Sequence, residues 1–230
     1  MKGLICGASG GLATAVAEAL LEIGWELDLV TRRSRAATVR GHFASAISQG
    51  KANVLEVEQD YEDFGPAAHY DAHFFFPALF SPSPLIGMDS HGIEEEIRVG
   101  LLSPVELTRK LLLASPPAAG QRQDFCYIGS TSAYAGFANT SVYCAVKHGL
   151  LGFVRAMNDE YKQSDVRFWL FSMGTMNTEM GAQLVDQDPT SFLDPADVAQ
   201  RIVQAVTSKS NLFEPEILMR RRTIRMKEKA

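Results

Sequence analysis

The chain has 230 residues, a formal net charge of −5 and 46% hydrophobic residues. Length and composition are typical of one globular domain with a sizeable core, and the acidic balance argues against a nucleic-acid-binding surface. No apolar run approaches the roughly 20 residues that span a membrane. Three cysteines and five histidines without ligand spacing predict no metal site and favour a reduced, cytoplasmic protein.

Short apolar runs alternate along the chain with stretches of helical periodicity. This alternation predicts a parallel sheet of about seven strands with helices on both faces, an α/β class, in a single domain 1–230. Pro104 falls inside the third helical stretch and predicts a kink or a split. The predicted strands are 2–8, 25–32, 51–59, 73–76, 123–130, 166–174 and 213–220. The predicted helices are 11–24, 35–49, 92–114, 141–162 and 195–208.

The stretch "CGASGGLA" joins the first predicted strand to the first predicted helix. Its glycines Gly7, Gly10 and Gly11 allow a tight turn and a close approach of backbone to phosphate. A helix N-terminus can then bind a pyrophosphate through its free N–H groups and its dipole. A plain turn is the alternative, but the position between strand and helix at the start of the chain favours a dinucleotide site.

The end of the second predicted strand indicates which dinucleotide is bound. Sites that prefer NAD place an acid there to hold the ribose hydroxyls, whereas this chain has Thr31 followed by Arg32 and Arg33. Guanidinium groups suit a dianionic 2′-phosphate. We therefore expect NADP(H), with two ordinary surface arginines as the alternative.

Tyr143 and Lys147 are one turn apart on the predicted helix 141–162. A free tyrosine has a pKa near 10, and a neighbouring ammonium group lowers it. Such a phenol could exchange a proton with a carbonyl or alcohol oxygen. Ser130, at the end of the fifth predicted strand, could donate a hydrogen bond to the same oxygen. A tyrosine and a lysine at this spacing also occur by accident on surface helices.

Taken together, these residues resemble the short-chain dehydrogenase/reductase family over nearly the whole chain. Ser130 is followed after twelve residues by Tyr143 and after three more by Lys147, and Gly7 and Gly11 match the family's glycine pattern. The resemblance implies a Rossmann fold and an NADP(H)-dependent oxidoreductase that interconverts a carbonyl and an alcohol. In the family the tyrosine is the general acid/base, the lysine lowers its pKa and holds the nicotinamide ribose, and the serine orients the carbonyl.

The resemblance implies further cofactor contacts. Ser9 and Leu12 would lie in the cofactor loop, and Arg32 occupies the place that selects NADP. Gly174 matches the glycine that follows the sixth strand, and Thr178 occupies the position that binds the cofactor amide or phosphate. These assignments come from the family and not from the composition or spacing of this chain.

The family also implies partners and a lid. We expect a small-molecule carbonyl or alcohol substrate and a homodimer or homotetramer that packs through helices near 100–114 and 141–160. The segment at about 179–195 is expected to form a short substrate lid, and Asp60 is placed near the adenine by analogy. The basic run 220–229 is expected to be a solvated tail.

Several positions depart from the family pattern and leave two functions open. Cys6 and Ala13 replace a threonine and a glycine of the glycine loop, and Met173 replaces a proline. Phe75 to Ala78 replace Asn-Asn-Ala-Gly, and Gly100 aligns with the usual catalytic asparagine, whose water relays protons to the lysine. The favoured hypothesis is an enzyme with a modified relay. The alternative is a nucleotide-binding homologue with little turnover that acts as a sensor or scaffold.

Overall fold

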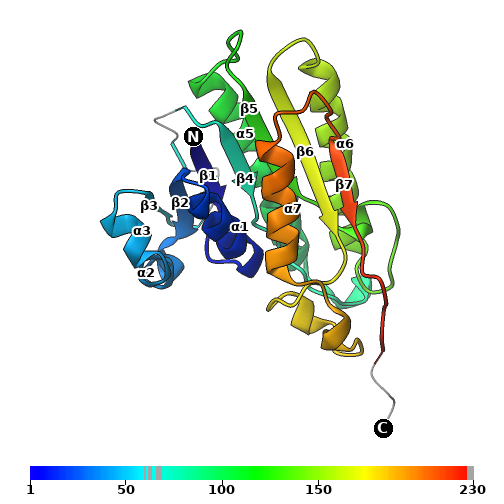
Figure 1. The fold of residues 1–230 in the computed structure, drawn as a ribbon. Helices are drawn as coiled ribbons and strands as arrows, with labels where there is room; N and C mark the ends of the chain where they lie inside the picture. Colours follow the sequence, from blue (N-terminus) through cyan, green and yellow to red (C-terminus); the bar gives the residue numbers. More distant parts are fainter. Residues whose placement is uncertain (60, 62–63, 66–68, 227–230) are drawn as a thin grey trace.

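The computed structural model describes residues 1–59, 61, 64–65 and 69–226, so that Asp60 lies outside the described residues. Its seven strands form one parallel sheet in the order β3-β2-β1-β4-β5-β6-β7 (Figure 1). The predicted α/β class and doubly wound parallel sheet are confirmed, and each predicted strand coincides with an observed one. The strands are β1 (Lys2–Cys6), β2 (Glu26–Arg32), β3 (Ala52–Val57), β4 (Ala72–Phe75), β5 (Gln123–Ile128), β6 (Val166–Met173) and β7 (Glu216–Met219).

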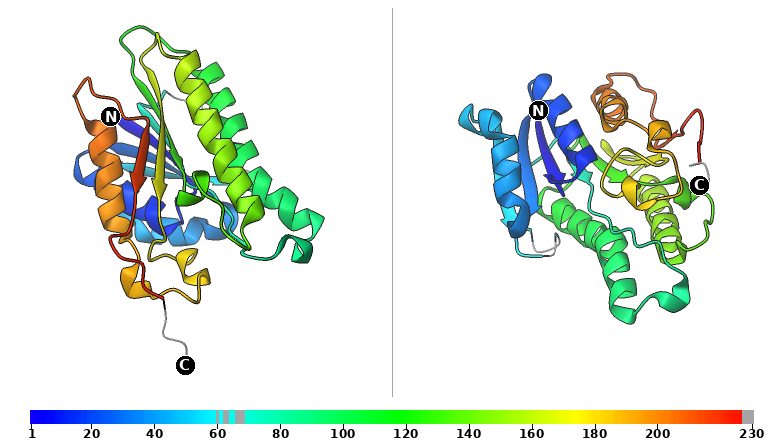
Figure 2. Two further views of the ribbon diagram at one scale, coloured as in Figure 1. Left: turned by 90° about the vertical axis from the view of Figure 1, so that its right-hand side faces the viewer. Right: turned by 90° about the horizontal axis from the view of Figure 1, so that it is seen from below.

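Helices cover both faces of this sheet, as Figures 1 and 2 show. Apolar residues of α1 and α7 pack on one face with those of α2, while α5 and α6 bury theirs against the other face. None of the helices in the described ranges is long and apolar enough to cross a bilayer. The α-helices are α1 (Gly11–Glu22), α2 (Arg33–His42), α3 (Ala44–Ser48), α4 (Ser90–Ile97), α5 (Ser103–Ala114), α6 (Ser141–Glu160) and α7 (Pro195–Thr207).

The helical stretch that contains Pro104 is interrupted, as predicted. A π-helical turn at Arg98–Leu102 joins α4 to α5, and Pro104 lies in the first turn of α5, where a missing N–H is tolerated. Gly100 lies within the π turn. A Cβ atom at Gly100 would come within 2.6 Å of Val146 Cγ1 on α6, so the two helices approach too closely there for a side chain.

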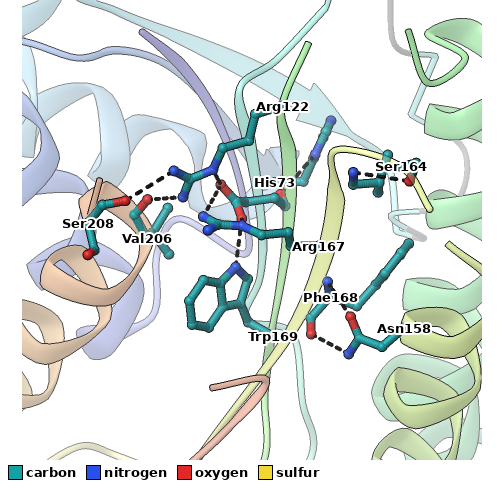
Figure 3. Close-up of polar contacts among 11 residues, drawn as sticks. His73, Arg122, Asn158, Ser164, Arg167, Phe168, Trp169, Val206 and Ser208 are labelled. Atoms are coloured by element: carbon teal, nitrogen blue, oxygen red, sulfur yellow. Dashed lines mark hydrogen bonds and ion pairs between the residues drawn. The ribbon is translucent and has the colours of Figure 1, made fainter. Parts of the chain in front are cut away.

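A cluster of buried charges joins two strands and a helix at the amino edge of the sheet (Figure 3). Its centre is Asp124, which is fully buried at the start of β5. The Asp124 carboxylate accepts hydrogen bonds from Arg122 Nε at 2.6 Å, Arg167 Nε at 2.7 Å and Trp169 Nε1 at 2.7 Å. Arg122 also donates to the carbonyl oxygens of Val206 and Ser208 at the end of α7. The cluster therefore connects β5 and β6 to α7, away from the edge that carries the candidate site.

Candidate functional site

The carboxyl ends of the parallel strands bring the predicted site residues to one edge of the sheet. The glycine loop follows β1, Arg32 ends β2, Ser130 follows β5 and Gly174 follows β6. Because the strand order reverses between β1 and β4, this edge contains the switch point at which doubly wound sheets bind their ligands.

The glycine loop is held closely against its neighbours. Gly7 has φ +82°, a backbone conformation that L-residues with side chains rarely adopt. Its N–H donates to the Val30 carbonyl at 3.0 Å, which ties the loop to the end of β2. A Cβ atom at Gly7 would lie 3.1 Å from the Pro77 ring in the loop after β4. Conformation and space thus both require glycine at this position.

The next residues of the loop are exposed. Ser9, Gly10 and Gly11 are open to solvent, and in the described part of the chain no side chain caps α1 at Gly10. A Cβ atom at Gly11 would lie 3.3 Å from Thr178 Cγ2, so two predicted cofactor contacts from distant parts of the chain are neighbours. The side chain of Leu12 is 5% exposed and belongs to the core, which leaves its backbone for any ligand contact. Uncapped N–H groups beside a glycine cradle fit a pyrophosphate.

The two arginines at the end of β2 have different surroundings. The Arg33 guanidinium is paired with Glu56, at 3.3 Å between Nε and Oε2, and also with Glu58. Arg32 is exposed, and its guanidinium hydrogen-bonds the phenol of Tyr61. Arg32 is therefore the more available of the two for an anionic group.

Ser130, Tyr143 and Lys147 come together from β5 and α6. The hydroxyl groups of Ser130 and Tyr143 are hydrogen-bonded to each other. Lys147 is 2% exposed, and its ammonium group donates to the Ile128 carbonyl at 2.8 Å. The Lys147 Nζ atom also lies 5.4 Å from the centroid of the Tyr143 ring. The structure thus assembles a serine, a tyrosine and a lysine that are separated in the sequence.

The electrostatics of this group differ from the prediction. Burial raises the pKa of Tyr143 to about 12, although the hydrogen bond with Ser130 acts in the opposite direction. The negative charge of Glu96 raises it further, and a lowering by Lys147 is not found. Burial also lowers the pKa of Lys147 to about 8, and the charge of Glu96 opposes this change. With this pKa the phenol is protonated near neutral pH.

The proline-rich loop after β4 lies beside Tyr143, and sequence reasoning did not identify its role. The Phe80 ring meets the Tyr143 ring edge-on, with 4.9 Å between centroids. The backbone N–H of Ser81 donates to the carboxylate of Glu96, which is 2% exposed on α4. Glu96 was missed because three consecutive glutamates on a helix normally form a solvated face.

The residues that depart from the family pattern after β4, in α1 and at the end of β6 take part in apolar packing. Phe75 stacks on Tyr127 with 4.8 Å between ring centroids, and the Phe76 N–H donates to the Cys6 carbonyl at 3.1 Å. That backbone bond keeps the ends of β4 and β1 joined without asparagine amides. Ala13 and Met173 are 1% and 4% exposed and belong to the core.

The expected lid contains two short 3-10 turns, Gly181–Gln183 and Pro189–Ser191. Its base is closed by hydrogen bonds between the backbones of 175–177 and Leu193. In the described part of 220–229, residues 220 and 222–226 are exposed, as expected of a solvated tail, but the backbone is not free. There the Arg225 carbonyl accepts from the Asp188 N–H at 2.9 Å, because the backbone after β7 runs along the lid.

Comparison with known proteins gives a consistent picture. The model of the short chain dehydrogenase family matches residues 80–189. Carbonyl reductase family member 4 of Xenopus tropicalis is 25% identical over 211 residues, which cover 86% of this chain and 88% of that protein. A metagenomic short-chain oxidoreductase in complex with NADP has a TM-score of 0.78 at 22% identity, covering 97% of this chain and 98% of the other. A 4-hydroxyisoleucine dehydrogenase mutant complexed with NADH has a TM-score of 0.77 at 16% identity, covering 96% and 97%.

Proposed function

The chain belongs to the short-chain dehydrogenase family, and on this premise we propose that it is an NADP(H)-dependent oxidoreductase. The proposed reaction interconverts a carbonyl and an alcohol on a small or medium substrate. The observation that carries the proposal is the hydrogen-bonded pair of Ser130 and Tyr143, one helical turn from the buried Lys147, at the ligand-binding edge of the sheet.

The glycine cradle and the exposed arginine support a phosphorylated dinucleotide. Gly7, Gly10 and Gly11 with the N-terminus of α1 would hold the pyrophosphate, and Thr178 beside Gly11 would contact the same end of the cofactor. Arg32 would bind the 2′-phosphate, with a smaller contribution from Arg33 because Glu56 and Glu58 already pair with it. The cofactor supplies the hydride when it is bound.

The remaining chemistry belongs to this chain's own side chains. The Ser130 hydroxyl orients the substrate oxygen and stabilises the charge that develops on it. Tyr143, whose pKa of about 12 keeps it protonated, donates its proton to that oxygen. Lys147 supplies the positive charge next to the phenol as the proton leaves.

A second candidate function follows from the helix interruption. Gly100 offers no side chain, and Val146 on α6 fills the space that a side chain would need. A homologue that binds the nucleotide and turns over little, as a sensor or scaffold, is consistent with that packing. The presence of Ser130, Tyr143 and Lys147 together favours the enzyme.

Titration with NADPH and NADH, followed by a panel of aldehydes and ketones, tests both functions. We expect tighter binding of NADPH than of NADH and oxidation of NADPH by at least one carbonyl compound. Tight binding of NADPH without turnover on a broad panel would support the sensor or scaffold. Failure to bind either nucleotide would contradict both candidates.

We also propose that the chain forms a homodimer or homotetramer. Large apolar side chains are exposed on the first of the two helices named in the prediction, Leu102 at 42% and Leu113 at 67%, and just before it at Ile97, also 42%. Such residues are typical of a surface that self-association covers. Sedimentation equilibrium tests this proposal, and a monomer at micromolar concentration would contradict it.

A further inference from the structure

Arg221, just past the end of β7, has no role in the proposed function so far. Its side chain is partly buried, whereas Arg220 and Arg222 on either side of it are exposed. The Cγ and Nε atoms of Arg221 lie 3.8 Å from the position that a Cβ atom of Gly174 would occupy. The side chain therefore lies against the residue that follows β6 and does not extend into solvent, where arginine side chains are mostly found.

The charge of Arg221 has no counter-charge, unlike that of Arg155. Glu216, on β7, accepts from Arg155 Nε at 2.6 Å and from Nη2 at 3.0 Å. Within the described ranges no carboxylate pairs with Arg221, and burial lowers the pKa of its guanidinium without an opposing acid. Its polar partner is the Ser191 hydroxyl, 3.4 Å from Nη1. A guanidinium carries five N–H donors, so most of them remain for a ligand.

The strand order places this guanidinium on the substrate side of the site. β5, β6 and β7 are adjacent, and the Gly174 N–H donates to the Met219 carbonyl at 3.0 Å where β6 and β7 end. Strands lie about 4.8 Å apart, so the end of β7 is about 10 Å from the end of β5, which carries Ser130. The glycine loop after β1 is four strands away, or about 19 Å. A group bound at Arg221 is thus closer to the reacting oxygen than to the pyrophosphate.

The expected lid, 179–195, holds the Arg221 side chain in place. The Ser191 hydroxyl accepts from Arg221 and also from the Arg225 N–H at 3.3 Å. The Arg221 guanidinium carbon lies over the Phe192 ring, 5.6 Å from its centroid. A guanidinium that rests on an aromatic ring keeps its N–H donors along its edge. Two parallel N–H groups on that edge match the two oxygens of a carboxylate.

We propose that Arg221 determines substrate specificity by binding a carboxylate group of the substrate, so that the substrates are oxo acids and the corresponding hydroxy acids. This proposal rests on the proposed function: Ser130 and Tyr143 receive the carbonyl oxygen, and Arg221 receives the carboxylate of the same molecule. One guanidinium balances the single charge of a carboxylate, whereas a phosphate dianion would leave a charge unpaired.

The test is a series of straight-chain oxo acids, from 2-oxo to 6-oxo, each compared with its methyl ester at saturating NADPH. The ester keeps the reacting carbonyl and removes the charge. We expect kcat/KM of the native chain to favour at least one acid over its ester by about tenfold or more. The ratio should fall close to one in Arg221→Gln and stay native in the matched control Arg220→Gln. Arg221→Lys keeps a charge without the planar fork and should retain part of the preference.

The ratio of acid to ester distinguishes recognition of the substrate from support of the lid. A purely structural role would lower kcat/KM for acid and ester alike in Arg221→Gln, and an unchanged ratio would overturn the proposal. A higher Kd of NADPH with an unchanged ratio would assign Arg221 to a phosphate of the cofactor instead. If Arg221→Gln fails to fold, Arg221→Lys and the native chain decide, and equal rates for acids and esters in the native chain are the contrary result.

A second readout separates this proposal from the proposed function. Reduction of carbonyl compounds without a preference for acids would support the reductase and overturn the role of Arg221. Absence of turnover would contradict the reductase, but calorimetric titration of the NADPH-loaded chain with the same acids and esters still measures the anion site. Tighter binding of an acid than of its ester, lost in Arg221→Gln and kept in Arg220→Gln, supports the site. Equal binding of acid and ester would overturn it.

Discussion

The amino and carboxyl edges of the same sheet both bury charged side chains, but they satisfy them to different degrees. At the amino edge, Asp124 accepts hydrogen bonds from two guanidinium groups, those of Arg122 and Arg167, and from an indole N–H. At the carboxyl edge, the Lys147 ammonium donates to one backbone carbonyl, and in the described part of the chain Oε1 of Glu96 has no partner. The first edge is a closed network, and the second retains capacity to exchange protons.

This difference indicates that the buried charges of the amino edge contribute to stability and those of the carboxyl edge to chemistry. A buried charge with a full set of partners holds elements together, and removing its partner is strongly destabilising. Burial displaces pKa values at both edges, raising that of Asp124 to about 6 and lowering that of Lys147 to about 8, but a buried charge with few partners also stays available to a ligand. We therefore expect substitutions at the two edges to act on different measured quantities.

Tyr143→Phe should have the largest effect and should act on chemistry alone. Loss of the phenolic proton is expected to lower kcat by about 10³-fold, within the usual range for a general acid. The melting temperature and the Kd of NADPH should stay close to the native values, because the ring and its contact with Phe80 remain. Steady-state kinetics and thermal unfolding measure both.

Tyr161→Phe is the matched control, since Tyr161 lies at the far end of α6 as its C-cap residue. It should leave kcat unchanged. Native-like turnover in Tyr143→Phe would remove the tyrosine from the mechanism.

Asp124→Asn should lower stability and leave turnover unchanged, which is the opposite of the result expected for Tyr143→Phe. The substitution leaves two guanidinium groups without their carboxylate, and we expect the free energy of unfolding to fall by about 3 kcal/mol. Turnover per folded molecule should be kept, because the cluster lies at the other edge of the sheet. Urea unfolding and active-site titration with NADPH separate the two quantities.

The surface pair of Asp159 and Lys162 provides the control. Asp159→Asn should change the free energy of unfolding by less than about 1 kcal/mol. A comparably small effect of Asp124→Asn would mean that the network at the amino edge is not what joins β5 and β6 to α7.

Arg32→Ala tests the carboxyl edge of the sheet at the proposed binding site for the 2′-phosphate of the cofactor. The exposed guanidinium of Arg32 should contribute about 2 kcal/mol to binding of a 2′-phosphate, so that its loss raises the Kd of NADPH by roughly 30-fold. The Kd of NADH should change little. Isothermal titration with both nucleotides measures this difference.

Arg33→Ala, whose partners are Glu56 and Glu58, should weaken NADPH binding by no more than about threefold. Equal losses of NADPH and NADH affinity in Arg32→Ala would contradict the assignment of NADP(H).

The fold was predictable because each strand and helix has its own hydrophobic period, and the strand–helix alternation defines the sheet. Ser130, Tyr143 and Lys147 were predictable as a group because they match the pattern of the family that the chain resembles. Glu96 was not, because its burial depends on how the π turn at Arg98–Leu102 directs α4 against α6. The raised pKa of Tyr143 was also missed, since burial and the charge of Glu96 are properties of the packed structure.

The Asp124 cluster at the amino edge of the sheet could not be predicted from the sequence either. Its arginines come from before β5 and from the start of β6, and the carbonyl groups that it binds end α7. The hydrogen-bonded residues are far apart in the sequence. Arg167 and Asp124 are separated by 43 positions, and Arg122 and Val206 by 84. No local pattern of charges indicates such a network before the strands are paired.

Lys147→Met should have the smallest effect on stability and the most direct bearing on the comparison, because the expected change is a gain in stability. Burial lowers the pKa of Lys147 from its ordinary 10.5 to about 8, so below pH 8 the folded chain holds a buried charge at a cost. As pH rises through this value, the folded state loses its proton before the unfolded state does, and the cost fades until both are neutral. Replacement by methionine should therefore raise the free energy of unfolding by about 1 kcal/mol at pH 7.

The gain should shrink toward about pH 10, where the unfolded lysine also becomes neutral. Urea unfolding of both proteins across this range measures it, and kcat should be lost at every pH. The Ile128 carbonyl loses a donor in the variant, which limits the gain because an unpaired carbonyl is itself unfavourable. A loss of stability in Lys147→Met that does not depend on pH would mean that the lysine holds the fold together as Asp124 does. The carboxyl edge would then be a second closed network, and the buried charges there would no longer indicate chemistry.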